Sequence, residues 1–220
     1  MIDEQRAFWS KVAPSYDRVV DLQIGPATRA LVRERLVREG RLGNAVEFGC
    51  GTGFYTQVLA ERAERVVATD CSPGMLAVAQ QRIDAANVRF QVEDCQRTTL
   101  ADGAFDTAFM SLVIHFTEPA ATLAEMRRIL KPGGTLIISN LDPQALGGLA
   151  RVRCLARIIY HGLTGYRTKP PKASLNHAPT EQQLHDLLIR AGFEVLSSET
   201  FRDPSRSSNI PVEYVRALRR

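Results

Sequence analysis

Short apolar runs alternate with longer amphipathic stretches through the middle of this chain. Apolar runs bounded by glycine or polar residues are typical of buried strands, and apolar positions that recur with the helical period indicate helices. The pattern predicts strands at 45–48, 65–69, 88–92, 105–112 and 135–139, and helices at 54–62, 72–86 and 117–130. Strands that alternate with helices predict an α/β fold, in which helices cover both faces of a parallel sheet.

Different patterns flank this alternating region. Two helices are predicted at 4–12 and 27–39, with a break near Pro14. Towards the other end, Thr180 and Gln183 form a capping box for a helix that runs to Arg190. Strands at 193–201 and 210–218 follow, and a turn is predicted at 131–134.

The composition is that of a globular domain. The chain has 220 residues, of which 45% are hydrophobic and 24% charged. Its apolar runs stay below the about 20 residues that a membrane helix needs, and the polar start of the chain lacks an apolar signal core, so we expect a cytoplasmic protein. The net charge of +4 is too small to predict a nucleic-acid partner. Four cysteines without paired short spacing predict free thiols and no metal site.

A glycine turn directly after the first predicted strand is the most informative motif. The segment 47–53 reads Glu-Phe-Gly-Cys-Gly-Thr-Gly, so Gly49, Gly51 and Gly53 alternate with other residues. Alternating glycines permit unusual backbone angles and let the main chain approach a ligand, and such a strand-to-helix turn predicts a nucleotide-cofactor site. In the dinucleotide fingerprint the third glycine lies later, at the place that Phe54 occupies here.

Acidic residues lie at or next to the ends of the first three predicted strands, namely Glu47, Asp70 and Asp94. Ligands of open α/β sheets bind beyond the carboxyl ends of the strands, so we expect these acids to surround one cleft. A carboxylate such as that of Asp70 can accept hydrogen bonds from two ribose hydroxyls. Three cysteines also follow strand ends, Cys50, Cys71 and Cys95, and we interpret them as small apolar fillers rather than as a soft-metal site.

The order and spacing of several motifs resemble those of the class I S-adenosylmethionine-dependent methyltransferases that act on small molecules. Beside the glycine turn, these motifs are Asp70–Leu76, Glu93–Asp94, Phe105–Asp106 and Arg128–Gly134. The resemblance covers roughly residues 7–139 and, more loosely, the C-terminal elements. It implies a doubly wound, mostly parallel seven-stranded sheet of Rossmann-like type with a C-terminal antiparallel strand. In a single domain, 1–220, we expect a helical lid at 1–40, a cofactor-binding core at 44–140, a helical substrate cap at 141–179, and a C-terminal helix and hairpin at 180–220.

The resemblance also implies roles for individual residues. S-adenosylmethionine is the expected cofactor and S-adenosylhomocysteine the product. Asp70 is expected to bind the ribose, Asp94 and Met75 the adenine, and Tyr16 of the lid to fold over cofactor and substrate. Plainer interpretations stay open, because Asp70 can cap the helix at 72–86 and Met75 can be core. The expected cofactor-binding residues are Tyr16, Glu47, Gly49, Cys50, Gly51, Gly53, Asp70, Cys71, Met75, Asp94, Cys95 and Ser111.

Two candidate catalytic residues face the expected acceptor, His115 and Tyr16. His115 follows the fourth predicted strand, and the ordinary pKa of histidine suits a general base near neutrality, although a histidine here can also lack a chemical role. His177 can face the substrate or lie in a loop. The basic, amphipathic segment 149–161 predicts contact with an anionic or lipid-like substrate or with a membrane surface, or else a packed helix with a solvated face.

The preferred interpretation is methyl transfer from S-adenosylmethionine to an O, N, S or C atom of a small molecule, quinone- or lipid-like. The alternative is an NAD(P)-dependent oxidoreductase, because Asp70 lies about 20 residues after the glycines, as that fingerprint also requires. Two residues count against the oxidoreductase: Phe54, which occupies the place of the third glycine, and the acidic Glu47 before the first glycine. A non-catalytic module that has kept the cofactor pocket is a third interpretation. The sequence leaves the oligomeric state open.

Overall fold

The computed structural model describes residues 2–154, 156, 178–205 and 209–220. Within these residues, seven strands form one sheet in the order β3-β2-β1-β4-β5-β7-β6. The neighbours among β1 to β5 pair in parallel, whereas β7 is antiparallel to both β5 and β6. The strands are β1 (Asn44–Phe48), β2 (Arg65–Asp70), β3 (Val88–Val92), β4 (Phe105–Ser111), β5 (Leu130–Leu141), β6 (Phe193–Phe201) and β7 (Val212–Arg219).

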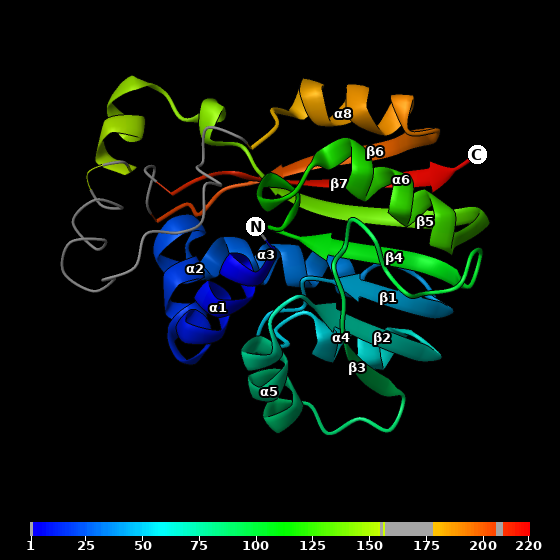
Figure 1. The fold of residues 1–220 in the computed structure, drawn as a ribbon. Coiled ribbons are helices and arrows are strands. Elements are labelled where there is room, and N and C mark those ends of the chain that lie inside the picture. The colour runs from blue at the N-terminus through cyan, green and yellow to red at the C-terminus, as the bar shows by residue number, and fades with distance from the viewer. Residues whose placement is uncertain (1, 155, 157–177, 206–208) are drawn as a thin grey trace.

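Helices cover both faces of this sheet, and two more lie at one end of it (Figure 1). One face is covered by α3 (Pro26–Val37), α4 (Thr56–Arg62) and α5 (Pro73–Arg82), and the other by α6 (Pro119–Ile129) and α8 (Glu181–Arg190). The N-terminal pair, α1 (Ile2–Val12) and α2 (Tyr16–Ile24), is joined by the 3-10 helix η1 (Ala13–Ser15). This pair lies where the parallel strands end, and two further 3-10 turns, η2 (Ile114–Phe116) and η3 (Pro143–Ala145), follow β4 and β5.

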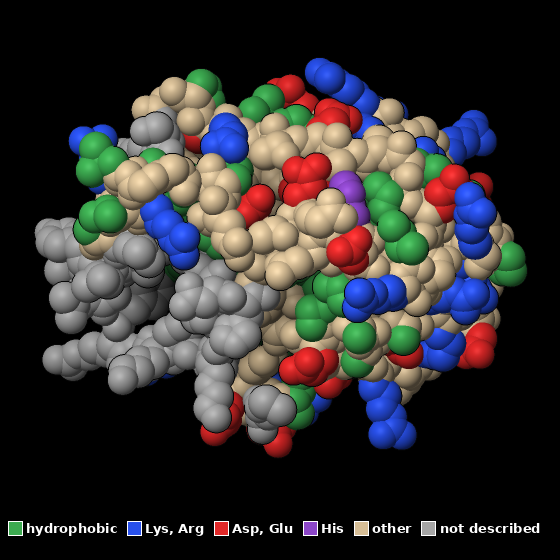
Figure 2. All heavy atoms as spheres, turned by 90° about the horizontal axis from the view of Figure 1, so that it is seen from above, with side chains coloured by type: hydrophobic (Ala, Val, Ile, Leu, Met, Phe, Trp, Pro, Cys, Tyr) green, Lys and Arg blue, Asp and Glu red, His purple; other side chains and the backbone are tan. Residues whose placement is uncertain are grey.

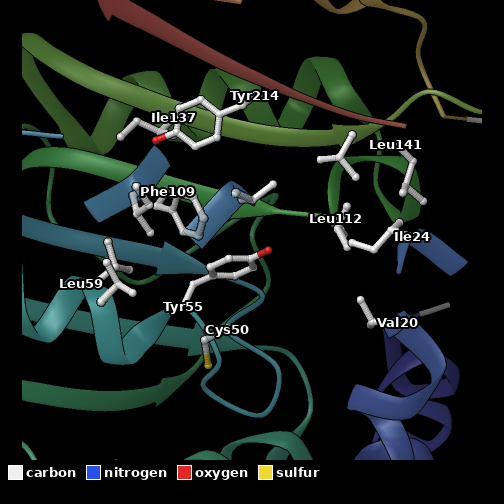
Figure 3. Close-up of a cluster of buried hydrophobic side chains, with 14 of the residues drawn as sticks. Val20, Ile24, Cys50, Tyr55, Leu59, Phe109, Leu112, Ile137, Leu141 and Tyr214 are labelled. Atoms are coloured by element: carbon white, nitrogen blue, oxygen red, sulfur yellow. The ribbon is translucent and has the colours of Figure 1, made fainter. Parts of the chain in front are cut away.

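The sheet separates two clusters of buried apolar side chains. On one face, Phe109 of β4 and Tyr214 of β7 belong to a cluster with Leu59 of α4 (Figure 3). On the other face, Ile138 of β5 belongs to a cluster with Met126 of α6 and with residues of α8. Strands that are buried on both faces read as continuous apolar runs, and this explains why the sequence pattern located them so well.

The predicted α/β fold class is confirmed, and so are the two predicted N-terminal helices, but the prediction missed a helix between them. The structure has a third helix, α2, between the two predicted ones. Pro14 does not break the chain into a loop, because it lies in the first turn of η1, where a missing backbone N–H costs little. The chain therefore continues from α1 through η1 into α2.

Among the other predicted elements, two boundaries differ from the structure by more than two residues. The helix predicted at 72–86 ends at Arg82, since Ile83 has extended backbone angles. The residues predicted as a turn at 131–134 lie within β5, where the pairing with β4 shifts from Phe105 opposite Leu130 to Thr107 opposite Thr135. They form an irregularity of the strand rather than a separate turn.

The predicted cap at 141–179 is described only in part. Leu149 and Val152 of the basic segment are 65% and 61% exposed. The rest of that segment after residue 156, and the candidate His177, lie outside the described residues. Among the helices that the structure describes, none is both long and apolar enough to span a bilayer.

Candidate functional site

A pocket lies at the carboxyl ends of the parallel strands, between the glycine turn, the start of α5 and the N-terminal helix α1. Of the residues predicted from the sequence, those on its wall are Tyr16, Gly49, Gly51, Asp70, Cys71, Met75, Asp94 and Cys95. The remaining lining residues were not among the predicted site residues, although Glu93 belongs to one of the motifs. They are Ile2, Gln5, Trp9, Thr69, Glu93, Gln96, Leu112, Val113, Phe116 and Thr117.

The glycine turn forms the floor of the pocket and requires glycine for two reasons. Gly49 and Gly51 have φ angles of +64° and +55°, which other residues rarely adopt. A Cβ on Gly49 would lie 2.3 Å from Cγ2 of Val113, and one on Gly51 would lie 3.1 Å from Cε1 of Tyr16. Gly53, in contrast, faces α5, where an added Cβ would lie 3.2 Å from Cγ1 of Ile83.

Asp70 connects the glycine turn to the start of α5. Its Oδ2 accepts a hydrogen bond from the Gly51 N–H at 3.0 Å, and its Oδ1 accepts one from the Ser72 N–H at 2.8 Å. Burial raises the pKa of Asp70 to about 6, although these two hydrogen bonds oppose the shift. Ser72 itself caps α5, because its Oγ accepts a hydrogen bond from the Met75 N–H. Each carboxylate oxygen of Asp70 still has a lone pair for a ligand hydroxyl.

The loop after β3 forms one side wall and is organised by a buried carboxylate. Glu93 is 6% exposed, and its Oε2 accepts a hydrogen bond from the Thr99 N–H at 3.0 Å. Asp94 accepts a hydrogen bond from the Gln96 N–H at 3.0 Å. These contacts fix the loop so that Asp94 and Cys95 line the pocket.

Aromatic side chains form the opposite wall. The Trp9 ring contacts the rings of Tyr16 and Phe116 edge-on, with centroids 6.0 Å and 4.9 Å apart. Gln5 donates a hydrogen bond to the Phe116 carbonyl at 3.1 Å, so α1 is tied to the turn that follows β4. Gln5 and Trp9 are four residues apart on a predicted helix and therefore share a face. That spacing, beside the candidate lid residue Tyr16, is the signal that could have identified them.

Asp17 ties the lid to the glycine turn and to two helices. It accepts hydrogen bonds from Arg29 of α3 at 2.8 Å, from Arg82 of α5 at 2.5 Å and from the Thr52 hydroxyl at 3.1 Å. Partial burial raises the pKa of Asp17, but the hydrogen bonds from Arg82 and Arg29 outweigh burial and hold the pKa below its ordinary value. Arg29 is 5% exposed and also pairs with Asp21 at 2.9 Å. Because Asp17 directly follows Tyr16 in the chain, these contacts hold Tyr16 over the pocket.

Some predicted site residues lie behind the pocket wall and do not line the pocket. They are Gly53 and the cofactor or catalytic candidates Glu47, Cys50, Ser111 and His115. Glu47 is 1% exposed, its Oε2 accepts a hydrogen bond from the Thr56 hydroxyl at 2.5 Å, and burial raises its pKa to about 8. The hydroxyls of Ser111 and Ser139 are 2.6 Å apart.

His115 is buried directly behind the aromatic wall. It is 5% exposed, and its ring lies against that of Phe116 with centroids 4.1 Å apart. Burial lowers the pKa of His115 to about 4, so the imidazole is neutral at physiological pH. Its Nδ1 has no hydrogen-bond partner among the described residues.

The thiols near the pocket are protonated. Burial raises the pKa of Cys71 to about 12 and also raises the pKa values of Cys50 and Cys95. A thiol, unlike a thiolate, is a poor nucleophile and a poor metal ligand. This agrees with the interpretation of these side chains as small fillers.

Comparisons with known proteins point to one family. A methyltransferase-domain family model matches residues 46–138. The chain is 37% identical to a malonyl-[acyl-carrier protein] O-methyltransferase of Serratia marcescens over 63% of this chain and 52% of that protein. It is 31% identical to a demethylmenaquinone methyltransferase of Deinococcus radiodurans over 84% of this chain and 83% of that protein.

A solved structure agrees with these sequence similarities. An S-adenosylmethionine-dependent methyltransferase from Thermotoga maritima aligns with a TM-score of 0.67 and 25% identity, over 98% of this chain and all (100%) of that one. The first matching curated relatives are longer proteins, since the chain spans only 26% to 54% of their length.

Proposed function

This chain belongs to the class I S-adenosylmethionine-dependent methyltransferases, and from that premise we propose that it transfers the methyl group of S-adenosylmethionine to a small acceptor molecule. The observation that carries the proposal is the joint position of Gly51 and Asp70 on the pocket floor, with Tyr16 above them. Here the backbone can approach a ligand closely, and a buried carboxylate is available to bind hydroxyls.

The residues of the pocket fit this cofactor. Added Cβ atoms on Gly49 and Gly51 would meet Val113 and Tyr16, so glycine at these positions lets those two pocket-lining residues pack against the turn. We assign the ribose hydroxyls to Asp70, the adenine amino group to Asp94 and the adenine face to Met75, all of which line the pocket. Glu47, Cys50, Gly53 and Ser111 then support the turn and the strand ends from behind the wall.

The chain's own contribution to the reaction would be alignment and the exclusion of water. The bound sulfonium supplies an activated methyl carbon, so the protein has to hold the acceptor atom in line with it. Tyr16 and Trp9 would cover the pocket, with Asp17 fixing the lid. We propose His115 as the general base, because its neutral imidazole, with Nδ1 unpartnered among the described residues, can accept a proton. Since His115 lies behind Phe116, the acceptor would have to reach it past that ring.

For the acceptor we propose a quinone- or lipid-like molecule. Two curated relatives were named above, and this chain spans more of the demethylmenaquinone methyltransferase than of the other. The other is a malonyl-[acyl-carrier protein] O-methyltransferase. The wall on the α1 side is apolar and aromatic, which suits such an acceptor. The exposed Leu149 and Val152, beside basic residues, would contact the acceptor or the membrane surface that holds it. The cytoplasmic location stays a prediction.

Two measurements test the proposal in order. Calorimetry with S-adenosylmethionine, S-adenosylhomocysteine and NAD+ should give binding of the first two only, whereas binding of NAD+ alone would favour the oxidoreductase. Transfer of a radiolabelled methyl group should then be assayed with demethylmenaquinone and with a malonyl thioester. Transfer to demethylmenaquinone is the expected result. Cofactor binding without transfer to any acceptor tested would favour the non-catalytic module.

A further inference from the structure

A second cluster of polar side chains lies away from the pocket, where α8 packs on β7. Glu181 and His185 are four residues apart at the start of α8 and therefore lie on the same side of the helix. Glu213 of β7 completes the cluster, and one ligand atom from each residue lies within 4.8 Å of the other two. Figure 2, which views the molecule from the α8 side, shows acidic side chains and a histidine close together on this face.

Glu213 is the unusual member of this cluster. Its side chain is fully buried, at 0% exposure. Its Oε1 lies 2.9 Å from His185 Nε2 and accepts a hydrogen bond from the Ser198 hydroxyl at 2.8 Å. Within the described part of the chain, the other oxygen, Oε2, is buried and has no hydrogen-bond partner. A carboxylate oxygen that has lost its water without gaining a partner is unfavourable, so something is expected to bind there.

A cation that Glu213 binds through both carboxylate oxygens would satisfy all of these groups, including the unpartnered Oε2. In a tetrahedral site, metal–ligand bonds of about 2.0–2.2 Å place neighbouring ligand atoms roughly 3.3–3.6 Å apart. His185 Nε2 and Glu213 Oε1 are 2.9 Å apart, so a shift of a few tenths of an ångström would admit the ion. The ion would take the place of the proton between those two atoms. Glu181 is exposed and can close the remaining gap by rotating its side chain. The Ser198 hydroxyl would orient the Glu213 carboxylate from the outer shell.

We propose that Glu181, His185 and Glu213 bind a divalent transition-metal ion, for which Zn²⁺ best fits one imidazole and two carboxylates. The ion would fasten the start of α8 to β7. Glu213 is paired with Asn140 in the β5–β7 ladder, and the Asn140 side chain donates a hydrogen bond to the Pro179 carbonyl just before α8. The metal would therefore stabilise the point where the chain returns to the sheet after the cap. It is separate from the pocket and takes no part in the proposed transfer.

Zn²⁺ binding to the metal-free 220-residue protein tests this proposal, with a chromophoric chelator as competitor and thermal unfolding as a second readout. We expect one equivalent to bind and the unfolding temperature to rise, because a ligand that binds the native state stabilises it. Glu181→Gln and His185→Gln should each weaken binding at least tenfold. Asp186→Asn, an exposed acid on the same helix, is the matched control and should bind like the wild type. Since Glu181 is exposed, its variant should fold even if Glu213→Gln does not.

The thiols near the pocket are the competing ligands. Replacing Zn²⁺ with Co²⁺ distinguishes the two sites, because sulfur ligands give strong thiolate-to-cobalt absorption and nitrogen or oxygen ligands do not. We expect a spectrum without thiolate bands. Binding that persists in Glu181→Gln and His185→Gln and shows thiolate bands would place the ion at Cys71 or Cys95 and overturn the proposal. Failure to bind any ion would overturn it as well. Neither result bears on methyl transfer.

Discussion

The ring of Tyr16 lies over Gly51, close enough that a Cβ added to the glycine would be 3.1 Å from the tyrosine Cε1. On its other side, Gly51 donates its backbone N–H to Asp70 at 3.0 Å. A single glycine is thus in contact with the lid and with the buried carboxylate. Any side chain at this position would disturb both.

Gly51→Ala should therefore lower the affinity for S-adenosylmethionine at least tenfold. Gly103→Ala is the matched control, because Gly103 has nearly the same φ, +58°, with no atom within 4 Å of the added Cβ among the described residues. Both variants should lose about 1–2 kcal/mol of unfolding free energy through backbone strain. Calorimetry and denaturant unfolding separate the two effects. Equal cofactor affinity in both variants would contradict the proposed role of Gly51.

The raised pKa of Asp70 predicts opposite effects of pH on stability and on binding. The folded-state pKa of about 6 exceeds the ordinary 3.8, so the folded protein holds this proton more tightly than the unfolded chain. As pH falls through 6 towards 4, Asp70 therefore adds to the unfolding free energy, by about 3 kcal/mol at most. Cofactor affinity should fall over the same range, because the protonated acid is a poorer acceptor for ribose hydroxyls.

Glu47 also has a raised pKa and would contribute to the pH dependence. Comparing the wild type with Asp70→Asn separates the contribution of Asp70 from that of Glu47. The variant should bind S-adenosylmethionine at least tenfold more weakly at pH 7.5. It should lose the wild-type change in affinity around pH 6. Calorimetry at several pH values, with urea unfolding in parallel, measures both quantities. An unchanged affinity profile in the variant would remove Asp70 from the binding site.

Asp17→Asn should loosen the lid. The change removes the charge that pairs with Arg29 and Arg82, and we expect a loss of about 1–3 kcal/mol in unfolding free energy. Cofactor affinity should also fall several-fold, because the single amide oxygen cannot accept from Arg29, Arg82 and Thr52 as the two carboxylate oxygens do, and these contacts fix the lid on the glycine turn. In the control, Asp21→Asn, Arg29 loses its other partner but the lid contact stays. If the two variants bind the cofactor equally well, Asp17 has only a structural role.

His115→Ala should reduce turnover at least tenfold with little change in cofactor affinity, as expected of a general base. A purely structural imidazole would instead affect stability. Added imidazole distinguishes these roles, because it can restore proton transfer in the variant but not the lost packing. Turnover equal to that of the wild type, in a variant that remains folded, would exclude the base role.

The sequence predicted the central strands β1, β4 and β5 from their continuous apolar runs. It predicted the more exposed β3 and β6 from the recognisable turns around them. It failed for α2, where Pro14 was interpreted as a break although it starts a 3-10 turn that leads into the next helix. At 131–134 it predicted a separate turn, whereas these residues form an irregularity within β5, where pairing with β4 skips from Leu130 to Thr135. In both places tertiary packing and backbone hydrogen bonds decide the local structure, and residue propensities do not report them.

The site was predictable only where a residue belongs to a motif. Gly49, Gly51, Asp70 and Asp94 lie at or just after strand ends, and all four line the pocket. Trp9 and Gln5 come from a helix whose position relative to the sheet is a tertiary property. Likewise, His185 and Glu213 are 28 positions apart in the sequence, so no local spacing rule could bring them together.

The position of Ile2 has a practical consequence for every assay described above. Ile2 lines the pocket, so any residues attached before it, a purification tag included, would leave the fold beside the proposed cofactor site. The last strand runs antiparallel to its neighbours and carries the C-terminus to the opposite end of the sheet (Figure 1). A tag fused after Arg220, which is exposed, would leave the pocket free. Comparing the two fusions would show how far an N-terminal extension impairs binding.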